Sequence, residues 1–305
     1  MKKRRFIISN SAVSGVIEAL LLVALVAIIL ATIQIVYIPD IMEDKETDHM
    51  SEVEKQFSYL KSTIDIQSMT KEKVLISSPL ALGNKELPYF VTMGATGQIA
   101  LYNQSDVGNC RIKILPVPTL QDFPGDFITD NDGIPLTSIN YEASNSYIDD
   151  RRYILEGGGI IVQNPSEEMM VKPSIIVEDT SDTKITIYYS LPFFSSSPGR
   201  KIDSCGYGNP DKTVFIHTNY SMDDSDSISV NSFQIYTNYP DAWNQSLIGT
   251  NGLLREYYQN GDVNVVNDDS QSPAKIEITP GNRNIDLELT VVKIGVQIGA
   301  GIVRN

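Results

Sequence analysis

The sequence is poor in the residues that usually carry metal-binding and catalytic chemistry. Its 305 residues include two cysteines and two histidines, at Cys110, Cys205, His49 and His217, and none belongs to a CxxC or HExxH pattern. A zinc site built on those motifs is therefore excluded. A GxSxG elbow is also missing, and a serine–histidine–aspartate site would have to use one of the two histidines. We therefore expect no enzyme activity, no catalytic residues and no cofactor.

Positive charge is scarce as well. Lysine and arginine number 24 against 38 aspartates and glutamates, giving a net charge of −14, and four of the basic residues are clustered at positions 2–5. The rest of the chain has no basic stripe, so it would repel a phosphate backbone, and nucleic acid is excluded as a partner. Such acidity suits a solvated extracellular surface. An anchored extracellular hydrolase stays open as an alternative, because any two of these acids could meet in space.

The longest feature present is an apolar run over residues 16–38. As a helix it is long enough to cross the hydrocarbon core of about 30 Å. Basic residues precede it and Asp40, Glu43 and Asp44 follow it, which predicts a cytoplasmic N-terminus and a head outside the cell. The run continues into Tyr37 and Pro39 without a small-residue cleavage site, which argues against an ordinary secretory signal.

One acid, Glu18, lies near the start of this apolar run, where a carboxylate costs a few kcal/mol in the bilayer. It could reach the headgroup level by itself, or it could find a cationic partner once helices pack together.

Residues 11–18, SAVSGVIE, and the apolar run after them resemble the class III signal peptide of archaeal type IV pilin-like proteins. The resemblance implies cleavage by a prepilin peptidase on the cytoplasmic face, between Ser11 and Ala12. It also implies that the processed helices leave the membrane and bundle with identical or related subunits, with Glu18 facing the free amino group of a neighbouring chain. The sequence departs from the pattern at Gly15, where proline is usual, and it has no charged residue directly before the cut. An unprocessed membrane anchor is the alternative.

Beyond Pro39, which we expect to kink the helix, Val53, Phe57, Leu60 and Ile64 form an amphipathic stripe. A helix over residues 12–67 would be on the order of 80 Å long. Its second half should lie against the protein's own head, and a plain stalk is the alternative. We therefore divide this part into a cleaved leader, residues 1–11, and a hydrophobic helix with an amphipathic stem, residues 12–68.

From residue 73 the pattern changes to short runs rich in Val, Ile, Tyr and Thr, separated by Gly, Pro, Asn and Asp. Strands are predicted over residues 74–82, 89–93, 98–102, 111–115, 153–163, 174–178, 184–189, 213–217, 227–236, 275–278 and 285–298. The connections are too short for parallel crossovers. The predicted fold class is α+β: a long N-terminal hydrophobic and amphipathic helix, then a mainly antiparallel β-sandwich-like head over residues 73–305, as two packed sheets or subdomains.

Three segments of the head stand out. Glycines 157–159 between apolar runs predict a hairpin turn rather than a phosphate loop. Residues 241–258 predict one or two short helices, with Trp243 packed onto the sheet or, as the alternative, exposed for adhesion. Residues 119–150 predict a long surface excursion. The hairpin and the late helix make the head similar to archaeal pilin-like surface proteins with a β head.

Several weaker patterns complete the predicted sites. If the head is exported, Cys110 and Cys205 could form a disulfide, or both could stay buried thiols. Sequons at Asn103, Asn219 and Asn244 predict N-glycosylation under the same condition. Asp130-Asn131-Asp132-Gly133 and Asp223-Asp224-Ser225-Asp226 carry oxygens that suit calcium. The twelfth position after Asp130 is Tyr141 instead of the required glutamate, so a structural turn is favoured over a calcium site.

The predicted function is a structural subunit of an archaeal type IV pilus-like surface filament, in which N-terminal helices form the core and acidic heads face outward. The alternative is a minor pilin or a membrane-anchored surface adhesion protein that does not polymerise alone. The predicted location is the cell surface, as a single-pass protein with an extracellular head or as a filament after assembly.

Overall fold

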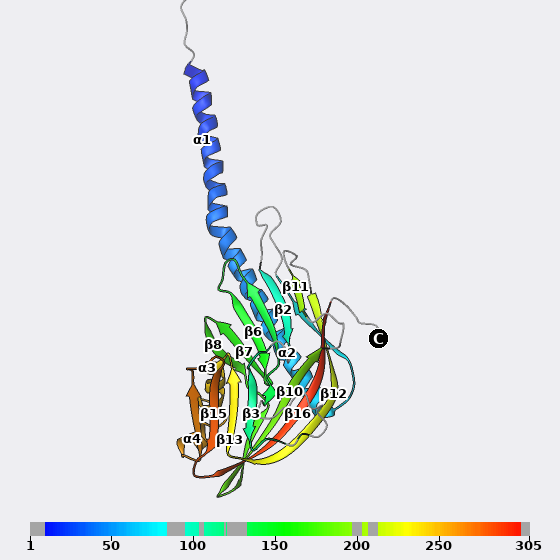
Figure 1. The fold of residues 1–305 in the computed structure, drawn as a ribbon. Coiled ribbons are helices and arrows are strands. Elements are labelled where there is room, and N and C mark those ends of the chain that lie inside the picture. The colour runs from blue at the N-terminus through cyan, green and yellow to red at the C-terminus, as the bar shows by residue number, and fades with distance from the viewer. Residues whose placement is uncertain are drawn as a thin grey trace, which may run out of the picture.

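The structure is a computed structural model that describes residues 10–83, 95–103, 107–118, 120, 133–196, 203–206 and 213–299. It gives the backbone alone for residues 10–14 and 203–206. The predicted strand over residues 89–93 lies outside the described residues. A long helical rod leaves one end of a β-rich head, as Figure 1 shows. The predicted fold class is confirmed.

The rod consists of α1 (Asn10–Thr32), a π-helical turn η1 (Ile33–Tyr37) and α2 (Ile38–Thr70). Pro39 stands in the first turn of α2, directly after the π-helical turn. Because proline has no N–H to donate, the wider turn before it absorbs the break in the α-helical hydrogen-bond ladder. The rod ends where Lys71 adopts a left-handed conformation with φ of 55°. The predicted helix is therefore confirmed, with Pro39 marking a π-helical turn.

The head contains three sheets among the described residues. The first has the order β1-β12-β16-β10-β9, the second β11-β2-β5-β6-β7-β8, and the third β14-β15-β13-β3-β4. The first sheet comprises β1 (Ile76–Ala81), β9 (Ile175–Ser181), β10 (Lys184–Ser196), β12 (Thr213–Val230) and β16 (Asn284–Gly299). The second comprises β2 (Thr96–Tyr102), β5 (Ser138–Ser144), β6 (Arg151–Glu156), β7 (Gly159–Asn164), β8 (Ser166–Val171) and β11 (Asp203–Gly206). The third comprises β3 (Arg111–Leu115), β4 (Ile134–Pro135), β13 (Ser232–Thr237), β14 (Val263–Asp268) and β15 (Ala274–Pro280), and two short helices, α3 (Pro240–Ile248) and α4 (Arg255–Gln259), follow β13.

Among the described strands, the pairings are antiparallel with one exception. β10 pairs with β16 in parallel, from Lys184 beside Asn284 to Ser196 beside Val296. The expectation that short connections exclude parallel pairs fails here because these two strands are not consecutive. Between them the chain forms β12 and three strands of the third sheet, β13, β14 and β15, which leaves ample length for a crossover.

The second half of the rod belongs to the head. The predicted stripe of Val53, Phe57, Leu60 and Ile64 is buried, in one core cluster with residues of the first and second sheets. α2 is therefore a packed core helix, and the plain stalk is wrong. A second core cluster joins residues of the first and third sheets with Ile154 and Ile161 of the second, and it includes Trp243 of α3.

Two predictions about the head need correction. Part of the predicted surface excursion, residues 119–150, is β5, which lies between β2 and β6 and buries Ile139 and Tyr141 completely. Its polar residues Asn140 and Glu142 alternate with these and face the other side, so the segment looks polar in sequence while being a central strand. The predicted strand over residues 227–236 is also two strands, because the chain leaves the first sheet after Val230 and enters the third at Ser232.

Candidate functional site

The surface of α1 is apolar on every side and is not covered by the head. Its large side chains range from 46% exposed at Val26 to 66% at Leu21. The rod contains an 18-residue stretch that is apolar enough to span a membrane. Its mean hydropathy is 2.9, and none of it is buried inside the protein. A helix of this kind is stable only in lipid or among other apolar helices. The exposed surface of α1 is therefore the candidate functional site.

The residues predicted for processing and assembly lie on this helix. Ser11 and Ala12 are in its first turn, where the backbone alone is described. Glu18 lies two turns further along, and its side chain is exposed. In a single chain the carboxylate thus faces the same surroundings as the apolar side chains around it.

The rod is joined to the head by a buried carboxylate. Glu46 of α2 is fully buried, and its two oxygens accept hydrogen bonds from the backbone N–H groups of Ser146, Tyr147 and Ile148 at 3.0, 2.8 and 3.1 Å. These three residues form the turn between β5 and β6. Three donors on one charged acceptor make a strong and directional joint.

Aromatic side chains continue the joint below Glu46. His49 Nε2 lies 3.1 Å from the hydroxyl of Tyr141, and the hydroxyl of Tyr153 donates to the carbonyl of Met50 at 3.2 Å. The Phe57 ring packs within 5.7 Å of the Tyr153 ring, centroid to centroid. Burial lowers the pKa of His49 to about 4, against the smaller opposite effect of Glu52, so the imidazole is neutral at physiological pH.

The lower end of α2 is held by side-chain contacts to the first sheet. Gln67 Nε2 donates to the carbonyls of Val74 and Thr218 at 2.9 and 3.0 Å. Lys71 Nζ lies 2.6 Å from Asp223 Oδ2. Together with the Glu46 joint, these contacts attach α2 along its length, so the direction of α1 is tied to the head.

Inside the head, one carboxylate connects three elements. Glu156 at the end of β6 is buried, and its Oε1 accepts from Thr237 Oγ1 of β13 at 2.7 Å and from Trp243 Nε1 of α3 at 2.9 Å. Burial raises the pKa of Glu156 to about 7, although both hydrogen bonds act in the opposite direction. Trp243 is fully buried, so the prediction that it packs onto the sheet is confirmed and its exposed adhesive role is wrong. The predicted hairpin turn is also present, at Gly157 and Gly158 between β6 and β7.

The structure does not test the predicted disulfide. Cys110 is a free and buried cysteine, and burial raises the pKa of its thiol to about 12, helped by the nearby charge of Glu156. Cys205 lies in β11 of the second sheet, and its side chain is outside the described residues. A bond between Cys110 and Cys205 stays a prediction.

The three sequons occupy different settings. Asn103 directly follows β2, and the two residues after it are outside the described part of the chain. Asn219 lies within β12, and Asn244 lies in α3. The hydroxyl-bearing residue of the last sequon, Ser246, is buried. N-glycosylation at these positions stays a prediction.

Only part of the two candidate calcium segments lies within the described residues. Residues 130–132 are outside the described residues, and Gly133 adopts a φ of 84°. Asp223 is contacted by Lys71 and by the hydroxyl of Tyr220. Among the residues that the structure describes, no group of three or more His, Cys, Asp or Glu side chains could hold a metal ion.

Sequence reasoning missed one histidine contact. Ser77 Oγ of β1 lies 2.7 Å from Nδ1 of the buried His217 of β12, whose ring stacks on Phe215. The two residues are directly opposite each other in the antiparallel pair. Only the strand register brings them together, since 140 residues separate them in sequence.

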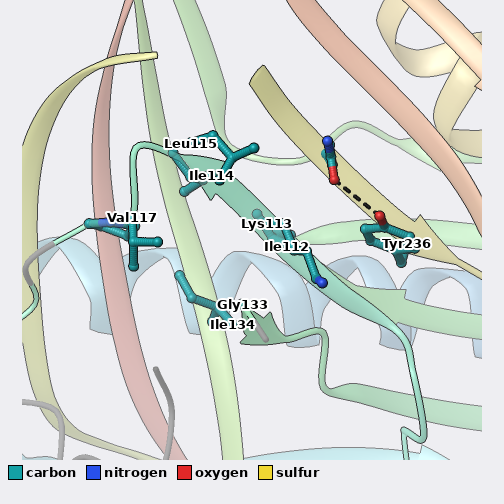
Figure 2. A pocket seen from close by; sticks show the side chains of 10 residues that line it. Ile112, Lys113, Ile114, Leu115, Val117, Gly133, Ile134 and Tyr236 are labelled. Atoms are coloured by element: carbon teal, nitrogen blue, oxygen red, sulfur yellow. Dashed lines mark hydrogen bonds between the residues drawn. The ribbon is translucent and has the colours of Figure 1, made fainter. Parts of the chain in front are cut away.

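A cavity of about 270 Å³ lies at the edge of the third sheet (Figure 2). Most of its wall is apolar and comes from β3 and the residues after it, including Leu115 and Val117, while Tyr236 donates to Gln234 Oε1 at 3.0 Å on the β13 side. The wall carries no acid and no histidine among the described residues. Its polar side chains are Lys113, Gln234 and Tyr236, and Lys113 Nζ lies 5.6 Å from the centroid of the Tyr236 ring.

The fold thus defines a class of protein by architecture: one N-terminal helix long and apolar enough to span a membrane, fixed to a β-rich head. No family model, curated protein or solved structure matches this chain. Function is therefore argued from the chain's own surfaces.

Proposed function

We propose that the protein is a structural subunit of a type IV pilus-like surface filament, in which copies of α1 bundle into the core and the acidic heads face outward. The observation that carries the proposal is the exposed apolar surface of α1, which is continuous with a stem that is anchored in the head. A simple membrane tether needs no fixed direction relative to its head. A filament subunit does, because the packing of its helices sets the position of every head.

Glu18 supports the proposal from the chemistry of the bilayer. A lone carboxylate in an apolar helix is costly in lipid and favourable beside a cation. Cleavage between Ser11 and Ala12 would create a free amino group near the start of each helix. A staggered neighbour could then place that amino group beside Glu18. The partners in this proposal are a prepilin peptidase and further copies of the chain or related subunits.

Mass spectrometry of the mature N-terminus, with electron microscopy of sheared surface fibres, tests the proposal. We expect a terminus at or close to Ala12 and fibres that contain the protein. An intact Met1 terminus would contradict the filament function and favour the alternative, a membrane-anchored surface binding protein with an outward-facing head.

Variants of Glu18 test the role of its charge. Both Glu18→Ala and Glu18→Gln should reduce the yield of fibres at least about tenfold. Glu43→Ala is the matched control, since this exposed acid lies outside the apolar run and should leave the yield unchanged. Normal fibres from Glu18→Gln would show that the charge has no part in assembly.

A further inference from the structure

One face of the second sheet carries a row of long polar side chains that crosses five strands. The register places Gln98 of β2 opposite Glu142 of β5, and Glu142 opposite Arg152 of β6. Arg152 is in turn opposite Gln163 of β7, which is opposite Glu167 of β8. Side chains alternate between the faces of a sheet, so this row faces away from the core cluster that contains α2.

Next to this row the same face carries shorter side chains. The neighbouring positions on β2 and β5 are Ala100 and Asn140, which are half-buried. Oδ1 of Asn140 is shielded from solvent and has no hydrogen-bond partner among the described residues. A buried acceptor without a donor is costly, and a bound ligand or water would relieve that cost.

Two tyrosines lie near these positions. Tyr102 at the end of β2 is on the same face and is 40% exposed. Tyr239 follows β13 and is half-buried, and burial raises its pKa, with further effects from the charges of Glu156 and Arg152 and from Tyr102 and Glu167. Tyr239 therefore stands near the polar row as well as near Tyr102. The far part of the face is covered by α3, where Gln245 Oε1 accepts from the backbone N–H of Met169 at 3.1 Å.

The charges on this face are balanced or negative. Nε and Nη2 of Arg152 both donate to Oε1 of Glu142, at 3.0 and 2.6 Å, which raises the pKa of the guanidinium. Glu167 adds a second carboxylate, which accepts from the backbone N–H groups of Asp241 and Ala242 at the start of α3. With its only described cation already paired, this face would repel an anionic ligand. It offers instead fixed donors and acceptors beside aromatic rings.

We propose that this face, made up of Tyr102, Asn140, Glu142, Arg152, Gln163 and Tyr239, is a binding site for a neutral oligosaccharide. A sugar ring has an apolar C–H face, which packs on an aromatic ring, and a rim of hydroxyl groups that both donate and accept hydrogen bonds. The tyrosines supply the apolar contact, and Asn140 with the Glu142–Arg152 pair supplies partners of both kinds for the hydroxyl groups. Such sites combine apolar surface with a few well-placed polar groups. This inference does not depend on whether the protein forms filaments.

The test uses the full chain, solubilised in detergent, on a microarray of neutral oligosaccharides built from hexose and N-acetylhexosamine units. The sugar that is retained best is then titrated by calorimetry. We expect retention on a subset of these sugars, and we expect Tyr102→Ala and Asn140→Ala each to weaken binding at least about tenfold. The Trp243 fluorescence of each variant should match that of the wild-type protein, because neither substitution reaches the core around Trp243.

Tyr258→Ala is the matched control, because this tyrosine of α4 is exposed to a similar extent, 43%, and lies outside the proposed site. It should bind the sugar as the wild-type protein does. No retention of any neutral sugar would overturn the proposal, as would equal binding by Tyr102→Ala and the wild-type protein. Retention of acidic sugars alone would overturn it too, since the charge balance of the face argues for a neutral ligand.

Discussion

The indole Nε1–H of Trp243 donates a 2.9 Å hydrogen bond to Oε1 of Glu156, and both side chains are buried in the head. The same carboxylate oxygen accepts from Thr237, so one acid connects the second sheet, the third sheet and α3. Trp243 is the only tryptophan of the chain. Tryptophan fluorescence therefore reports on the surroundings of this one side chain.

Glu156 should make the head less stable as the pH rises towards neutral. Its pKa is about 7 in the folded state and near the ordinary value of 4.5 in the unfolded state. Between these values the folded state holds a proton that the unfolded chain releases, so the free energy of unfolding falls as the pH rises. The loss is at most about 3 kcal/mol. The free energy of unfolding of the wild-type protein minus that of Glu156→Gln should therefore fall between pH 4.5 and 7, as measured by urea unfolding followed by Trp243 fluorescence. A difference that stays constant over this range would refute this role.

His49 should act in the opposite direction. Its pKa is about 4 in the folded state and 6.5 in the unfolded state, so between these values the unfolded chain holds the extra proton. The free energy of unfolding then rises with pH, by up to about 3 kcal/mol. The two effects overlap between pH 4.5 and 6.5 and oppose each other. The free energy of unfolding of the wild-type protein minus that of His49→Gln should therefore rise between pH 4 and 6.5. A difference that stays constant from pH 4 to 6.5 would contradict the pKa of His49.

Removal of the Glu46 carboxylate should weaken the attachment of the stem. Glu46→Ala leaves three backbone N–H groups of the β5–β6 turn without their acceptor, and we expect a loss of about 3 kcal/mol in the free energy of unfolding. Hydrogen exchange should accelerate at Ser146, Tyr147 and Ile148. Glu43→Ala, at an exposed position of the same helix, should change stability by less than about 0.5 kcal/mol. Equal effects of the two substitutions would show that the joint is not a specific one.

Two glycines with nearly the same positive φ allow the cost of backbone strain to be measured apart from the cost of overpacking. Gly157 has φ of 57° and Gly108 has φ of 59°. A Cβ at Gly157 would lie 2.7 Å from Cζ2 of Trp243 and 2.8 Å from the Tyr189 hydroxyl, whereas a Cβ at Gly108 would meet no atom of the described residues within 4 Å. Gly108→Ala should cost about 1 kcal/mol of stability from the positive φ alone. Gly157→Ala should cost about 2 kcal/mol more, because it also overpacks the core. Thermal unfolding of both variants measures the difference, and equal losses would mean that the Trp243 contact is easily displaced.

The apolar run, the stripe from Val53 to Ile64 and the glycine turn at Gly157 are local patterns, and the sequence by itself determined the helices and the hairpin that they predict. The period of the hydrophobic residues decides which face of a helix is buried, and a positive φ favours glycine wherever it occurs. The location of most strands followed from the same kind of local signal. β5 was missed because its polar face is as rich in Asn, Glu and Ser as a surface loop.

The tertiary structure alone decided which residues meet. Pairing of β10 with β16, the placement of Thr237 and Trp243 around Glu156, and the polar row from Gln98 to Glu167 all join residues that are distant in the chain. A strand carries no local signal for its partner, because its backbone groups can pair with any other strand in either direction. The partner is chosen by how side chains of the whole head pack together, and a shift of one residue in the register would turn the polar row towards the core.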